Sequence, residues 1–284
     1  MFTLTIENQA GSRLTLTQKE SIYQVVNIDG LDPPKASIFT NEIANMDGAK
    51  FNSAKMDVRN VVLTIKINGD VESNRQTLYT FFRSGKWCKI FFKNTNRDVY
   101  CEGYAETIAV GLFTESEEMQ VSILCPNPYF KSLQLIYDDI SKVFAAFEFP
   151  FSIAPEGIEF SIIDEYREAT ILNQSEIDGG MIITITAERD DIPNPIIYDS
   201  DTGQFIKLNL TLNEGDTVII NTNKGNKSVK LIVDGITENA ISTFGNNYTW
   251  LQMKIGINHF SYSADKNAEY LRIIFERHIL YEGV

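Results

Sequence analysis

Apolar and polar residues alternate along many segments of this chain, and that period of two restricts the possible folds more than any other feature. Residues 61–67 carry apolar side chains at every odd position. Such alternation places those side chains on one face of a β-strand. Residues 3–7, 13–16, 89–92 and 119–124 also have strand composition. The sequence therefore predicts a mainly β protein.

One segment has the period of a helix instead. Leu78, Phe81 and Phe82 stand at positions i, i+3 and i+4, which share one helix face. Ser73 or Asn74 is suited to cap the first turn. The spacing predicts one helix over residues 74–84, packed on a sheet.

The length of 284 residues predicts two domains. Two prolines end the 119–124 strand, so we expect a first domain over residues 1–131 and a connector over 132–152. The second half has turn glycines about every ten residues, a spacing typical of an antiparallel sandwich. We expect that sandwich over 153–276 and a tail over 277–284. Its expected strands are 181–186, 204–210, 217–221, 228–233, 250–254 and 270–275.

The charge balance argues against tight binding to nucleic acid or to an anionic membrane. The chain has 25 Lys and Arg against 38 Asp and Glu, a net charge of −13, whereas affinity for a phosphate backbone depends on basic residues. No apolar run approaches the ~20 residues that span a bilayer. The start lacks signal-peptide features, so we expect folding in a cytoplasm.

The sequence offers little support for catalysis. Neither His259 nor His278 belongs to an HExxH motif, and no GxSxG motif occurs. Residues 199–203 resemble the start of a calcium loop but lack its later glycine and glutamate, so they predict a turn. We expect no catalytic residue, no metal and no cofactor. A glycosidase pair of carboxylates from separate strands is neither excluded nor located by the sequence.

The three cysteines, Cys88, Cys101 and Cys125, form no CxxC motif, and we expect them to be buried thiols. Trp250 has two interpretations. It could stack against a sugar, or it could pack within the sandwich, as large aromatic side chains commonly do.

Several segments, in this order, make the chain resemble the distal tail protein family of long-tailed, non-contractile phages. The most specific is the CPNPYF exit from a strand, in residues 120–130. The others are residues 59–65, 75–82, 103–106, 194–198, 201–203, 212–216, 218–221 and 256–258.

The resemblance implies a structural virion component. In that family the first domain forms a hexameric ring that joins the tail tube to tail-tip or baseplate proteins. The second domain is a galectin-like β-sandwich that in some members holds receptor-binding proteins or contacts sugars. The resemblance also implies that residues 277–284 return to the first domain. Assembly would occur in the bacterial host cytoplasm, and DNA would pass through the bore without specific binding or membrane insertion.

Residues 40–55 are the segment we expect at the ring interface. They are long for a hairpin connection, and long segments of this kind are commonly functional. Ile43, Met46 and Phe51 would be the contact residues. A surface loop that tucks one or two side chains into its own domain is the other interpretation.

Two further hypotheses concern the bore and the sandwich. The net charge of −13 suggests carboxylates along the bore, which would repel DNA phosphates. The alternative function is a carbohydrate-binding sandwich that contacts host glycans through Trp250. The sequence shows no cluster of His, Asn and Arg around Trp250, which such binding needs.

Overall fold

The computed structural model describes residues 2–44, 47–111, 117–140, 167–245 and 248–284, and it divides into two compact units. The first unit comprises residues 1–133 together with Leu280–Val284, and the second comprises Gln134–Ile279. The chain crosses between the units within β10 (Phe130–Asp139) and again within β21 (Leu271–Tyr281). The second unit is therefore an insertion in the first.

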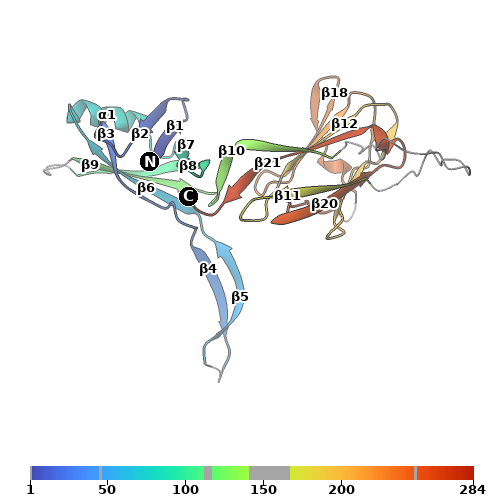
Figure 1. The fold of residues 1–284 in the computed structure, drawn as a ribbon, viewed down its shortest axis with the longest axis horizontal. Coiled ribbons are helices and arrows are strands. Elements are labelled where there is room, and N and C mark those ends of the chain that lie inside the picture. Colours follow the sequence, from blue (N-terminus) through green and yellow to red (C-terminus); the bar gives the residue numbers. More distant parts are fainter. Residues whose placement is uncertain (1, 45–46, 112–116, 141–166, 246–247) are drawn as a thin grey trace, which may run out of the picture. The chain divides into compact units, whose positions relative to one another are not determined.

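The first unit is built around one antiparallel sheet (Figure 1). Its strand order is β2–β1–β7–β8–β9–β6–β3. A bridge between Thr17 and Gln24 brings the two ends of this order together. The strands are β1 (Thr3–Asn8), β2 (Arg13–Leu16), β3 (Tyr23–Asp29), β6 (Arg59–Ile67), β7 (Trp87–Lys93), β8 (Asp98–Val110) and β9 (Glu118–Cys125).

The alternating side chains of the predicted strands form the core of this unit. Leu63 and Ile65 of β6 are fully buried, as are Leu4 and Ile6 of β1. All three cysteines are free and buried, as predicted. The five first-half strands predicted from sequence are confirmed, with differences of up to two residues at their ends.

The predicted helix is present but begins earlier than expected. Helix α1 covers Val71–Phe81, and its cap is Asp70, whose carboxylate accepts a hydrogen bond from the Ser73 backbone N–H at 3.4 Å. The expected cap at Ser73 or Asn74 is wrong, because the aspartate one turn earlier already satisfies a free N–H. Leu78 and Phe82 are buried, as the spacing predicts. No helix within the described parts of the chain has the length and apolar character needed to cross a membrane.

A two-stranded hairpin projects from the first unit (Figure 1). Its strands are β4 (Ala36–Glu42) and β5 (Ala49–Met56), and they form a separate two-stranded sheet. Every residue of β5 is exposed. The segment expected as a long connection, residues 40–55, is thus largely strand.

The second unit is a β-sandwich. One sheet has the order β19–β18–β17–β12–β21 and the other β11–β20–β14–β15. Phe260 of β20 and Phe275 of β21 come from opposite sheets and meet edge to face, with ring centroids 5.0 Å apart. These strands are β11 (Arg167–Asn173), β12 (Ile182–Ala187), β14 (Ile196–Asp199), β15 (Phe205–Lys207), β17 (Thr217–Asn221), β18 (Ser228–Val233), β19 (Ile236–Asn239) and β20 (Gly256–Ser263).

The described part of the second unit also has smaller elements. Strands β13 (Ile192–Pro193) and β16 (Thr211–Leu212) pair with each other, and two short 3-10 turns cover Ile241–Thr243 and Ala268–Tyr270. Asp234 and Gly235 both have positive φ and join β18 to β19. This is the tight turn that the Asp-Gly pair predicts.

Three sequence-based expectations differ from the structure: two segment boundaries and one strand. Residues 132–139 of the expected connector belong to β10, while 141–152 lie outside the described residues. The expected tail, 277–284, begins inside β21. Residues 250–254, expected as a strand, make only one isolated bridge, at Met253. Met253 exchanges two backbone hydrogen bonds with Gly179, and side chains bond to the main chain of Lys254, as described below.

Gly30 should be intolerant of any side chain. Its φ is +87°, and an added Cβ would lie 2.0 Å from the carbonyl oxygen of Asn60. We expect Gly30→Ala to lower the free energy of unfolding of the first unit by about 2–4 kcal/mol. Fluorescence of Trp87 during denaturant unfolding, in a Trp250→Phe background, measures this change.

Gly11 supplies a matched control, because its φ is +78° but nothing lies within 4 Å of its added Cβ. Gly11→Ala should cost only the backbone strain, about 1 kcal/mol. Equal losses for the two variants would show that the contact with Asn60 is unimportant.

Candidate interaction surfaces

The β4–β5 hairpin exposes apolar side chains on both of its faces. Ile38 and Phe39 are neighbours in a strand, so they point to opposite sides, and both are more than half exposed. Phe51 is 62% exposed and Ile43 is 46% exposed. Met46, the third expected interface residue, lies outside the described residues. An isolated two-stranded hairpin is marginally stable in water, so this surface is suited to contact with another protein.

The base of the hairpin is closed by polar contacts. The backbone N–H of Asp57 donates to the carbonyl oxygen of Lys35 at 2.9 Å. The hydroxyl of Ser37 donates to the Asp57 carboxylate, at 2.8 and 2.9 Å from its two oxygens. The two strands are therefore joined at the point where they leave the first unit.

Trp250 belongs to an aromatic cluster in the second unit. Its ring centroid lies 5.1 Å from that of Phe244 and 6.1 Å from that of Tyr248. The Lys227 ammonium lies 5.3 Å from the Trp250 centroid. Trp250 is half-buried and packs against the core of its own unit. The ring thus has internal packing partners, and Tyr248 is the more exposed member, at 40%.

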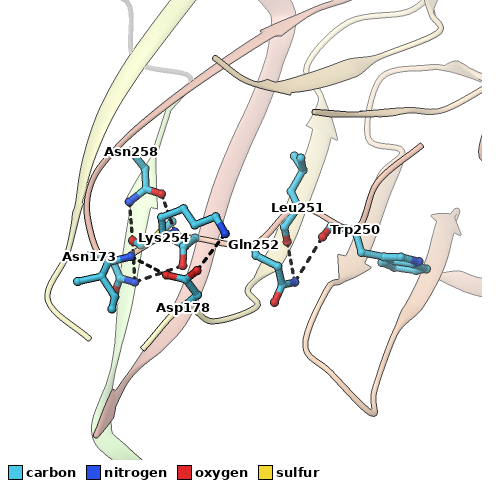
Figure 2. Close-up of polar contacts among 9 residues, drawn as sticks. Asn173, Asp178, Trp250, Leu251, Gln252, Lys254 and Asn258 are labelled. Atoms are coloured by element: carbon cyan, nitrogen blue, oxygen red, sulfur yellow. Dashed lines mark hydrogen bonds and ion pairs between the residues drawn. The ribbon is translucent and has the colours of Figure 1, made fainter. Parts of the chain in front are cut away.

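The segment that follows Trp250 is held by side-chain amides and a carboxylate, which Figure 2 shows converging on Lys254. Asn258 accepts from the Lys254 N–H at 2.7 Å and donates to the Lys254 carbonyl at 2.8 Å. Asn173 donates to the same carbonyl at 3.1 Å. Asp178 pairs with the Lys254 ammonium at 2.9 Å and accepts from the Ile255 N–H at 2.9 Å. These bonds occupy the N–H and carbonyl of Lys254 and the N–H of Ile255, so these groups are not part of a strand ladder.

The turn at residues 199–203 is joined to β20 by contacts between Asp201 and His259. Asp199 accepts hydrogen bonds from the N–H groups of Asp201 and Thr202, which makes the turn predicted from sequence. The Asp201 carboxylate then contacts Nδ1 of His259 at 2.8 Å and its backbone N–H at 2.9 Å. The hydrogen bond to Asp201 raises the pKa of His259, and the same bond lowers the pKa of Asp201. Within the described parts of the chain, no group of three His, Cys, Asp or Glu is placed to hold a metal ion.

Comparison with protein families identifies the second unit. Residues 174–278 match the family described as siphovirus-type tail component, C-terminal domain. The match lies within the second unit, which therefore resembles this tail component domain. A search of curated proteins found no match.

Solved structures extend the likeness to the whole chain. The crystal structure of the SPP1 Dit (gp 19.1) protein, described as a paradigm of the hub adsorption apparatus in phages that infect Gram-positive bacteria, matches with a TM-score of 0.69 at 13% identity. It covers 98% of this chain and 99% of that one. Two structures of the phage p2 baseplate, activated with Sr and with Ca, match with TM-scores of 0.54 and 0.52. Each has 12% identity and covers 98% of both chains.

The predicted resemblance to the distal tail protein family is therefore confirmed, and so is the mainly β fold class. The tail component domain accounts for the second unit, and the fold of the SPP1 Dit protein accounts for both units. Sequence reasoning did not find the amide cluster around Lys254, because isolated asparagines carry no periodic signal.

The contacts of Asn258 should be essential to the tail component domain. Asn258 is 2% exposed, and its removal takes away the acceptor of the Lys254 N–H and one of the two amide donors to the Lys254 carbonyl. We expect Asn258→Ala to lower the free energy of unfolding of the second unit by about 2–3 kcal/mol. Trp250 fluorescence in a Trp87→Phe background measures it. Asn226→Ala, at an exposed turn position, should change it by less than about 0.5 kcal/mol; similar losses for both variants would contradict the assigned role.

The ion pair at β20 gives a pH-dependent signal. Because the Asp201 carboxylate favours the imidazolium form, His259 should titrate above its usual value of 6.5. Asp201→Asn should return the midpoint toward that value. NMR titration of the imidazole protons measures both, and an unchanged midpoint in the variant would rule out Asp201 as the cause.

Proposed function

We propose that this chain forms a hexameric ring at the end of a phage tail and joins the tail tube to the tail-tip or baseplate proteins. It is a structural tail component with the fold of a phage hub protein. The observation that carries the proposal is an exposed, apolar hairpin on a chain whose second unit is a tail component domain. Such a protein works by assembling with other proteins, with no covalent bond made or broken.

A closed ring needs two different surfaces on each protomer, because its interface is heterologous. The β4–β5 hairpin supplies one of them. Its apolar residues lie on both faces, so a neighbour that enclosed the hairpin would bury Phe39 and Phe51 together. The proposal assigns Ile43, Met46 and Phe51 to this contact.

The second unit is proposed as the attachment site for further tail proteins, including a receptor-binding protein. The matched structures, a protein of a hub adsorption apparatus and a phage baseplate, support this role. The proposed location is the tail tip of the virion, after assembly in the host cytoplasm.

The distribution of charge removes the argument for an acidic bore. The first unit holds 14 basic and 16 acidic residues, whereas the second holds 11 and 22. The net charges are therefore −2 and −11. A ring built from first units would owe little to the total of −13, so that total does not support carboxylates along the bore.

Truncating Phe51 tests the ring. Phe51→Ala should leave a folded protomer, because the side chain is exposed, and should reduce the fraction of hexamer at least about tenfold, as the loss of an anchoring aromatic does at interfaces. Light scattering after size exclusion measures a mass of six times 32.2 kDa or of one chain. Negative-stain microscopy shows the ring directly.

Ile236→Ala is the matched control, because Ile236 is 66% exposed and lies on the second unit. That variant should assemble like the unchanged protein. An intact ring in Phe51→Ala would remove the hairpin from the interface, and an unchanged protein that stays monomeric even with its neighbouring tail proteins would overturn the ring itself.

A further inference from the structure

Arg59 is a buried charge whose four identified hydrogen-bond acceptors are all main-chain carbonyl oxygens. It is 3% exposed. Its Nε donates to Pro128 at 2.6 Å, and one terminal nitrogen donates to Asp32 at 2.7 Å and also to Gly30. The other terminal nitrogen donates to Glu282.

The Arg59 guanidinium also stacks on the ring of Phe130, 4.3 Å from its centroid. Burial lowers the pKa of Arg59. A charge removed from water requires compensation, and the four carbonyl dipoles supply it. This arrangement uses the planar fork of arginine, which lysine cannot reproduce.

The four carbonyls join the hairpin to two other parts of the first unit. Gly30 and Asp32 lie on the segment that enters β4, and Arg59 itself follows the exit from β5. Pro128 lies in the turn between β9 and β10. Glu282 belongs to the segment that returns after the second unit. Both ends of the hairpin therefore meet at one side chain.

The returning segment, Leu280–Val284, also contacts the residues that precede β4. The Val284 N–H donates to the Leu31 carbonyl at 3.1 Å. Gly283 lies so close to Pro33 that an added Cβ would be 3.1 Å from its Cδ. Arg97 donates to the Gly283 carbonyl and stacks on Tyr281, 4.4 Å from its centroid.

We propose that Arg59 and residues 280–284 form a junction that fixes the base of the β4–β5 hairpin to the first unit. Arg59 is then a positioning residue for the ring contact, although it lies away from the exposed apolar side chains. The functional consequence rests on the proposed ring, whereas the junction itself can be tested in the protomer alone. A hairpin with a fixed base meets its neighbour in one direction, which lowers the entropic cost of association.

Hydrogen exchange on the protomer tests the junction. Two variants weaken it from different sides: Arg59→Lys, and deletion of residues 282–284. In each, amides of residues 31–42 and 49–58 should exchange at least about tenfold faster, because local opening no longer breaks the junction bonds. Amides of the buried strands β6 and β9 should keep their protection. The fraction of hexamer should fall in both variants.

Arg13→Lys is the matched control, because the Arg13 side chain is 63% exposed and pairs with Glu7 on the surface. It should change neither exchange nor assembly. Unchanged exchange at the hairpin base in the deletion variant would overturn the junction, and so would uniformly faster exchange across the whole first unit, which indicates general destabilisation. Faster exchange at the base with normal assembly would keep the junction and count against the ring contact. If Arg59→Lys does not fold, the deletion alone decides the question.

Discussion

One buried guanidinium holds together parts of the first unit that are far apart in the sequence. Arg59 binds carbonyl oxygens of Gly30, Asp32, Pro128 and Glu282. A charge in this position is tolerated only because each bond is made to a fixed dipole. Since the partners are backbone groups, the arrangement depends on the path of the chain, and at Gly30 that path leaves no room for a side chain. The hairpin, the core sheet and the returning segment all depend on it.

Sequence reasoning succeeded where one face of a strand is buried. Residues 61–67 alternate because β6 packs one side on the core. The hairpin strands β4 and β5 had no such signal, since β5 has no buried face to impose a period. The strand expected at residues 250–254 is wrong for a different reason: two of the side chains that bond to Lys254, those of Asn173 and Asp178, are distant in the sequence. No local pattern marks a single arginine such as Arg59 as the centre of a network.

The two units contribute different physical properties to an assembled tail. The first is nearly neutral and presents apolar side chains on a hairpin, so copies of it can approach closely. The second has a charge of −11, which disfavours association between its own copies. In the proposed ring, this division favours contact through the first unit.

The insertion of the second unit has a consequence for biosynthesis. Residues 280–284 leave the ribosome only after the entire sandwich has been translated, yet they contact Leu31 and Pro33 near the start of the chain. The first unit therefore cannot acquire its final contacts during translation of its own strands. A nascent chain interrupted within the sandwich would lack the contacts that residues 280–284 make with the segment entering the hairpin.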